Sequence, residues 1–233
     1  MSALPQSPDN RVSERLQALE AKIDEACARA GRKRSDVTLV GISKFHSVDA
    51  MRSAYAGGLR NFGENYAQEM SAKMAELNAV APEICWHFTG RVQRNKAKLM
   101  AGCHWIHGVS SEAGLRVLTE KAPGANFLLQ MSEEEQKKGF TFDGLHREFE
   151  ALLRVAGARL QGLMSLPPAG QTPAARREHF VALRRLRETL EAEFAIELPH
   201  LSMGMSADFE VAIEEGATFI RVGTAIFGPR PVA

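Results

Sequence analysis

Lys44 is the residue of this sequence whose position best suits covalent chemistry. It comes directly after the apolar segment Val40 to Ser43, which is typical of a buried β-strand. A lysine held at such a strand end can lose its proton when desolvation or a neighbouring cation lowers its pKa, and the free amine can then form a Schiff base with a carbonyl compound. The alternative is a lysine that only extends into water from the end of the strand.

A second group of residues, rich in glycine and hydroxyl side chains, is suited to binding a phosphate. It lies in two short motifs, L-S-M-G-M-S (Leu201 to Ser206) and R-V-G-T-A-I-F-G (Arg221 to Gly228). Small residues let backbone N–H groups approach an anion, and hydroxyl groups add donors. The residues concerned are Ser202, Gly204, Ser206, Gly223 and Thr224. Together with Lys44 they predict a phosphorylated ligand that carries a carbonyl group, either pyridoxal 5′-phosphate or the sugar phosphate of a class I aldolase.

These residues must be positioned by a scaffold, and the sequence indicates one in which short apolar segments alternate with helical segments. We expect eight strands, at 37–43, 60–63, 85–89, 104–109, 125–131, 158–164, 199–203 and 217–222. This alternation predicts an α/β fold, a single (β/α)₈ TIM barrel with an extra N-terminal helix, and the alternative is an open doubly wound sheet. In a barrel the site is formed by the loops that follow the strands, which is where the candidate residues stand.

Composition excludes several classes of protein. The 29 Lys and Arg residues against 28 Asp and Glu residues leave a net charge of +1, which argues against a nucleic-acid partner. No stretch is apolar enough for a membrane span, and three cysteines without zinc-like spacing predict a reduced cytoplasmic protein without disulfides. We expect residues 1–10 to be a flexible N-terminus and residues 11–233 to be one domain. His104 and His107 should lie on opposite faces of a strand, so we expect no metal site.

Six motifs in order along the chain resemble the pyridoxal phosphate homeostasis protein family. They are V-G-I-S-K (40–44), F-G-E-N-Y-A-Q-E (62–69), W-H-F-T-G-R-V-Q-R-N-K (86–96), G-L-M-S-L-P-P (162–168), L-S-M-G-M-S-A-D (201–208) and R-V-G-T-A-I-F-G (221–228). The sequence departs from the family at Thr89 and Val92, where bulkier aliphatic residues are usual, and at Gln130 and Met131, where an asparagine commonly ends the strand.

The resemblance implies a barrel like the N-terminal domain of alanine racemase that binds pyridoxal 5′-phosphate as its cofactor. It implies that Lys44 is the Schiff-base lysine and that Arg221 faces the pyridine nitrogen, where its charge would keep that nitrogen unprotonated. It also implies a group of further cofactor-binding residues. These are Ser202, Gly223 and Thr224 in the phosphate site, Met203 and Ser206 close by, and Asn65 near the ring.

The family further implies a non-catalytic protein of intracellular cofactor homeostasis that stores, buffers or delivers pyridoxal 5′-phosphate. Transient contact with apo-enzymes that need the cofactor and a monomeric state are expected. The alternative is a weak amino-acid racemase, which would need a second base opposite Lys44. In alanine racemases a tyrosine of a second domain is that base, and this chain stops at Ala233, about ten residues after the last expected strand. Its two tyrosines are Tyr55 and Tyr66, and we expect Tyr66 to pack against Met70.

Overall fold

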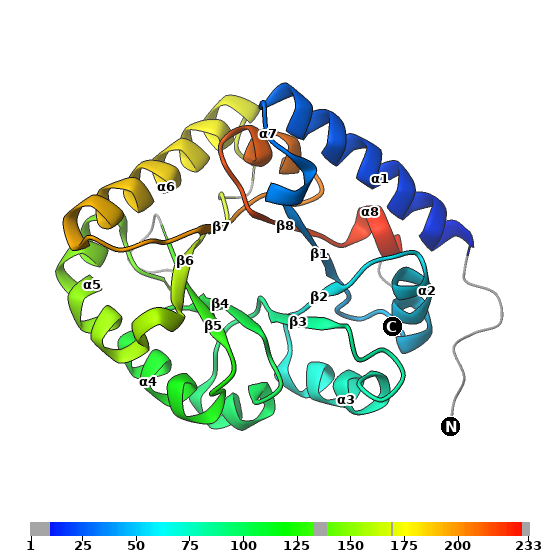
Figure 1. Cartoon of the computed structure of the whole chain (residues 1–233), viewed down its shortest axis with the longest axis horizontal. Helices are drawn as coiled ribbons and strands as arrows, with labels where there is room; N and C mark the ends of the chain where they lie inside the picture. Colours follow the sequence, from blue (N-terminus) through cyan, green and yellow to red (C-terminus); the bar gives the residue numbers. More distant parts are fainter. Residues whose placement is uncertain (1–9, 133–138, 169, 230–233) are drawn as a thin grey trace.

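The computed structural model describes residues 10–132, 139–168 and 170–229, and it forms a closed barrel of parallel strands in the order β1 to β8. Figure 1 shows the strands around a central axis with helices outside them. The strands are β1 (Thr38–Ile42), β2 (Asn61–Glu64), β3 (Cys85–Phe88), β4 (Trp105–Val109), β5 (Asn126–Gln130), β6 (Leu160–Met164), β7 (His200–Ser202) and β8 (Phe219–Val222). All eight predicted strands and the barrel are confirmed.

The outer ring alternates with these strands. Its helices are α1 (Asn10–Arg29), α2 (Val48–Ala56), α3 (Ala67–Leu77), α4 (Glu112–Lys121), α5 (Phe142–Ala156), α6 (Pro173–Phe194), α7 (Phe209–Glu214) and α8 (Thr224–Phe227), with 3₁₀ helices η1 (Arg34–Asp36), η2 (Arg94–Met100) and η3 (Gly157–Arg159). Within the described ranges, no helix is both long and apolar enough to cross a membrane.

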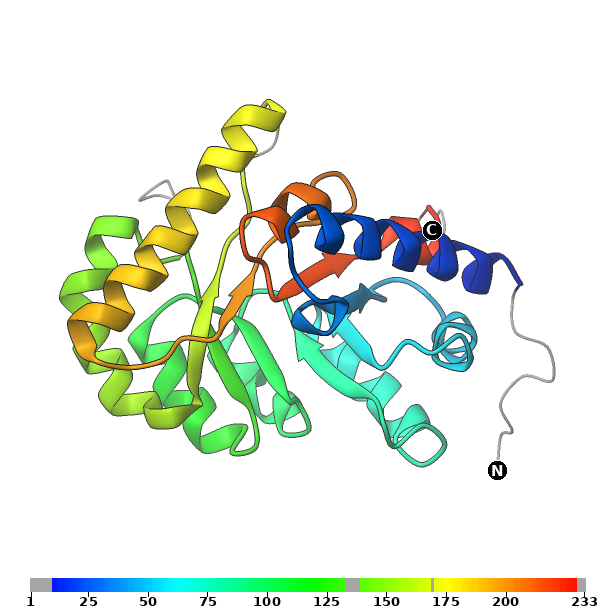
Figure 2. The same cartoon turned by 45° about the horizontal axis from the view of Figure 1, so that its top comes forward.

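The N-terminal helix α1 completes the ring where the last barrel helices are short. It packs against α2, α7 and α8, and Figure 2 shows it alongside α7 and α8. Leu16, Leu19 and Ile23 repeat at helical spacing and are buried on this side. Because α8 has four residues, α1 covers apolar surface that a longer helix would otherwise cover. Of the expected flexible segment 1–10, residues 1–9 lie outside the described residues, and the expectation is wrong for Asn10, which begins α1.

The interior of the barrel holds a small apolar cluster and a layer of buried polar side chains. Val40, Leu128, Met164 and Phe219 come from four different strands and pack together. The buried interior side chains also include His87, His107 and Arg221, and Arg221 pairs in register with Val40 of the apolar cluster. Interiors of such barrels are usually filled by branched aliphatic residues, so this polar layer calls for a functional explanation.

Candidate functional site

The barrel mouth, meaning the end where the strands terminate, collects the candidate residues. Lys44 follows β1 after Ser43, Asn65 directly follows β2, and Thr224 begins α8 after β8. Because β1 pairs with both β2 and β8 in parallel, these strand ends are neighbours. The fold therefore places the predicted lysine beside both Asn65 and the end of β8.

The turn that carries Lys44 is tied to helix α3. The carbonyl oxygen of Ser43 accepts a hydrogen bond from Lys73 Nζ at 2.8 Å, and the N–H of Phe45 donates to Glu69 Oε1 at 2.7 Å. Phe45 has a positive φ of 66°, which is rare for a residue with a bulky side chain. Lys44 itself is partly buried.

Under this turn lies a buried ion pair. Lys73 Nζ is 2.7 Å from Glu64 Oε1, and that oxygen also accepts a hydrogen bond from Ser43 Oγ at 2.7 Å. Burial raises the pKa of Glu64, and the Lys73 ammonium opposes that rise. No sequence pattern assigned a role to Glu64, Glu69 or Lys73, because nothing in a sequence shows which side chains reach a distant loop.

Arg221 is the buried cation of the barrel interior. Its Nη1 donates to Ser202 Oγ at 2.6 Å, and its Nη2 donates to the carbonyl oxygen of Ser165 at 2.9 Å. Burial lowers the pKa of Arg221 to about 10, so the guanidinium stays charged at neutral pH. Among the described residues it makes no salt bridge, and both acceptors named here are neutral.

A chain of hydrogen bonds continues from Arg221 across the barrel. Ser202 Oγ is 2.7 Å from His107 Nδ1, His107 Nε2 is 3.0 Å from His87 Nδ1, and His87 Nε2 is 3.0 Å from Asn61 Oδ1. We call these five residues, Arg221, Ser202, His107, His87 and Asn61, the interior relay. It joins β8, β7, β4, β3 and β2.

The proton positions in the interior relay follow from its two ends. Burial lowers the pKa of His87 to about 3 and holds that of His107 well below its ordinary value, so both rings are neutral at pH 7. Asn61 Oδ1 can only accept, so His87 carries its proton on Nε2 and accepts from His107 Nε2–H. His107 Nδ1 then accepts from the Ser202 hydroxyl, which in turn accepts from Arg221. The relay thus has one consistent direction of donation.

The loops after β7 and β8 form the candidate phosphate site. Thr224 and Ser206 are exposed, and Gly223 precedes α8. The N–H groups of Ile226 and Phe227 donate to the Gly223 carbonyl oxygen, whereas those of Thr224 and Ala225 precede any helical carbonyl they could bind. The N–H of Arg221 donates to the carbonyl oxygen of Gly204, which holds the loop after β7 against β8. Gly204 has φ of 90°, and a Cβ there would lie 2.6 Å from the Cβ of Ala212, so this close approach requires glycine.

Ser202 and Met203 are less exposed than the rest of this site. The Ser202 hydroxyl is engaged by both His107 and Arg221, and its side chain is buried. Met203 is also buried, and its N–H donates to the carbonyl oxygen of Phe219. The geometry therefore connects Ser202 most directly with the guanidinium of Arg221, and leaves Thr224 and Ser206 as the hydroxyl groups open to the mouth.

Thr89, which follows β3, orients the side chain of Asn65. The hydroxyl of Thr89 donates to Asn65 Oδ1 at 3.1 Å, which leaves the amide NH₂ of Asn65 able to donate elsewhere. Gly90 permits this arrangement, because a Cβ there would lie 2.0 Å from the carbonyl oxygen of Asn65. A bulky aliphatic side chain in place of Thr89 could not make this bond.

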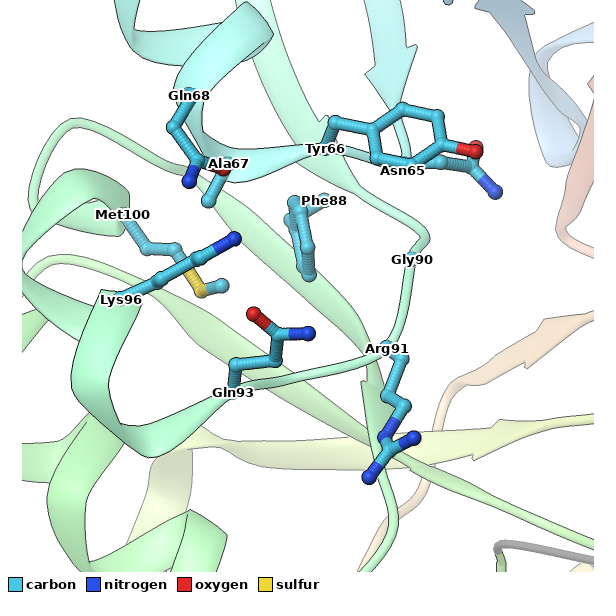
Figure 3. Close-up of a pocket in the computed structure, with 10 residues that line it drawn as sticks. All are labelled: Asn65, Tyr66, Ala67, Gln68, Phe88, Gly90, Arg91, Gln93, Lys96 and Met100. Atoms are coloured by element: carbon cyan, nitrogen blue, oxygen red, sulfur yellow. The ribbon is translucent and has the colours of Figure 1, made fainter.

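A hollow of about 240 Å³ lies beside Asn65, between the loops that follow β2 and β3. Figure 3 shows Lys96 and Gln93 directed toward its centre and Phe88 behind them. Arg91 also lines it, and none of its lining residues is acidic. Tyr66, at its rim, is 49% exposed, and its ring lies 5.2 Å from that of Phe45. Tyr66 is the N-cap residue of α3, and its expected packing against Met70 stays a prediction.

Comparisons with known proteins agree over nearly the whole chain. Residues 15–231 match the family described as alanine racemase, N-terminal domain. A pyridoxal phosphate homeostasis protein of Aquifex aeolicus (strain VF5) is 40% identical over 224 residues, covering 93% of this chain and 97% of that protein. One from Pseudomonas aeruginosa is 41% identical over 226 residues, covering 94% and 96%. The structure of PipY from Synechococcus elongatus PCC7942 with PLP bound is 35% identical with a TM-score of 0.82, covering 93% and 100%.

Proposed function

The chain belongs to the family of pyridoxal phosphate homeostasis proteins, built on the alanine racemase N-terminal domain, and from this premise we propose that it holds pyridoxal 5′-phosphate on Lys44 and delivers it to other proteins. PipY, a relative with the same fold, is described with PLP bound. When bound, the cofactor supplies an aldehyde whose C=O bond is exchanged for a C=N bond to a primary amine, with release of one water.

The observation that carries the proposal is the buried, charged Arg221 at the mouth that holds Lys44. A guanidinium has five N–H donors, and the two hydrogen bonds found here go to neutral oxygens. A buried cation without a salt bridge among the described residues favours an electron-rich ligand. A pyridine nitrogen and a phosphate group are both acceptors of this kind, so the residues present fit the cofactor.

The other residues have complementary roles in this proposal. Thr224, Ser206 and the N–H groups that follow Gly223 bind the phosphate, and Ser202 holds Arg221 in place. Asn65 donates from its NH₂ group toward the ring, and Met203 packs beneath the site. In this proposal the residues of the barrel mouth therefore contact the phosphate, the ring and the aldehyde of the cofactor.

We further propose that the protein does not turn over a substrate. Arg221 can only donate, so a ring nitrogen that accepts from it must be unprotonated, and the cofactor is then a weaker electron sink. His87 and His107 are buried, neutral and engaged with each other, so they do not offer a base at the mouth. A weak amino-acid racemase, with Lys44 as one base, is the alternative.

We propose that the protein is a single-domain, cytoplasmic monomer and that it delivers the cofactor through transient contact with apo-enzymes.

The test is a transfer assay and a racemase assay on the same preparation. We expect the loaded protein to restore activity to an apo-enzyme, and the Lys44→Ala variant to carry less cofactor and to restore less. Steady turnover of L-alanine, abolished by Lys44→Ala and faster than with free cofactor by orders of magnitude, would instead establish the racemase.

A further inference from the structure

The backbone on both sides of Lys44 is held by a single turn of α3. Lys73 and Glu69 are four residues apart on this helix and form an ion pair of 2.7 Å. Lys73 binds the carbonyl oxygen before Lys44, and Glu69 binds the N–H after it. One oxygen of Glu69 accepts from both Lys73 and Phe45, so the two attachments are mechanically linked.

The turn needs such support because of the conformation of Phe45. With φ of 66° this residue is in the left-handed region, which is unfavourable for a residue with a Cβ and persists only when surrounding contacts impose it. Phe45 is 46% exposed, so burial of its side chain does not impose the conformation. The turn is closed by the hydrogen bond from the His46 N–H to the Ser43 carbonyl oxygen, and the hydrogen bond from the Phe45 N–H to Glu69 holds Phe45 from the side of α3.

Lys73, which binds the Ser43 side of the turn, is itself held rigidly. Lys73 is buried, and its three donors reach the Ser43 carbonyl, Glu64 and Glu69. Glu64 is fully buried and also accepts from the Ser43 hydroxyl. The ammonium therefore has no freedom to rotate away without leaving an unpaired buried charge.

We propose that Glu69 and Lys73 are positioning residues for Lys44, which fix its backbone so that its amine is presented at the barrel mouth. They act through the backbone of Ser43 and Phe45 and need not touch the cofactor. This inference rests on the proposed function, because Lys44 is the residue that forms the covalent bond. It assigns a role to Glu69 in the F-G-E-N-Y-A-Q-E motif and to Lys73, which the cofactor contacts alone leave unexplained.

The experiment compares Glu69→Ala, Glu69→Gln and, as a matched surface change on the same helix, Glu76→Gln. Glu69→Gln keeps an acceptor oxygen for the Phe45 N–H, whereas Glu69→Ala does not. We expect Glu69→Ala to slow covalent attachment of pyridoxal 5′-phosphate to Lys44 about tenfold, the size expected when one strained residue is released. The other two variants should attach it at nearly the wild-type rate.

A rescue variant separates positioning from general damage. Glycine accepts a positive φ without strain, so Phe45→Gly added to Glu69→Ala should restore much of the lost rate. Amide hydrogen exchange of apo-protein gives a readout without cofactor. The Phe45 N–H should be protected in wild type and Glu69→Gln, and unprotected in Glu69→Ala.

A cofactor analogue distinguishes a defect in presenting the Lys44 amine from a defect in binding the ring and the phosphate. Pyridoxine 5′-phosphate keeps the ring and the phosphate but has an alcohol in place of the aldehyde, so its affinity should be equal in wild type and Glu69→Ala. The positioning role would be overturned if Glu69→Ala lost as much affinity for this alcohol as for pyridoxal 5′-phosphate. It would also be overturned if Glu69→Ala attached pyridoxal 5′-phosphate at the wild-type rate. Absence of attachment at Lys44 in the wild-type protein would instead overturn the proposed function itself.

Discussion

The interior relay makes a quantitative prediction about two buried serines near Arg221. Ser202 and Ser165 are both fully buried, but their hydroxyl groups differ. Ser202 Oγ joins Arg221 to His107, whereas Ser165 Oγ has no hydrogen-bond partner within the described part of the chain. The Ser165 contact with Arg221 comes from its carbonyl oxygen, which an alanine retains. Ser202→Ala and Ser165→Ala are therefore a matched pair of changes.

The magnitudes follow from the bonds that each change removes. Ser202→Ala loses a hydrogen bond from a charged group, worth about 1.5–3 kcal/mol, and a neutral one worth about 1 kcal/mol. We therefore expect a loss of about 3 kcal/mol in the free energy of unfolding, out of a typical total of about 5–15 kcal/mol. Ser165→Ala removes a buried polar group without a partner, so its stability should equal or exceed that of wild type.

Urea unfolding of the apo-protein measures the difference. With a slope of about 3 kcal/mol per M, Ser202→Ala should unfold at about 1 M lower urea, and Ser165→Ala at the wild-type midpoint or above it. Combining Ser202→Ala with His107→Ala should cost less than the sum of the two, because both break the same chain. Equal midpoints for the two serine variants would refute the interior relay as a stabilising network.

Three further predictions concern pH and the cofactor. His87 and His107 are neutral in the fold with pKa values below the ordinary 6.5, so the unfolded chain binds more protons in acid. With its pKa lowered to about 3, His87 alone should lower the free energy of unfolding by about 2 kcal/mol between pH 7 and 5, and His107 should lower it further; a urea midpoint that stays flat over this range would contradict their neutral burial. Unphosphorylated pyridoxal should bind more weakly than pyridoxal 5′-phosphate, and Thr224→Ala should reduce this difference in affinity. Equal affinities of the wild-type protein for the two compounds would exclude a phosphate site. Borohydride reduction and peptide mapping should place the pyridoxyl group on Lys44, and labelling elsewhere would overturn that assignment.

The direction of donation in the interior relay also explains how two histidines can be buried beside the charged Arg221 without electrostatic repulsion. His87 and His107 lie close to His104, His200 and Arg221, and all of these neighbours disfavour a charged imidazole. Two neutral rings in series still satisfy every ring nitrogen, because each donates on one side and accepts on the other. The barrel can thus support a buried guanidinium without a carboxylate among the residues that bind it.

Much of the architecture could be predicted from local patterns. Apolar strand-length segments alternate with helical segments, and this periodicity indicates eight strands in an α/β fold; the structure shows the closed barrel and excludes the open doubly wound sheet. The special residues at strand ends follow as candidates because parallel strands bring all their carboxyl ends to one mouth. Lys44, Asn65 and Thr224 were placed in this way, and the structure brings their strand ends together.

The sequence by itself determined the alternation of strands and helices and the set of residues that follow the strands, because this periodicity is local and repeats along the chain; the closure of the barrel came from the structure. Only the tertiary structure decided which side chains bind one another. Lys73 reaches the Lys44 turn from a helix, and His107 reaches Ser202 across the barrel, 95 positions along the chain. Such partners are chosen by how strands and helices pack in space and by the need to pair every buried polar group, and no periodicity along the chain records that choice.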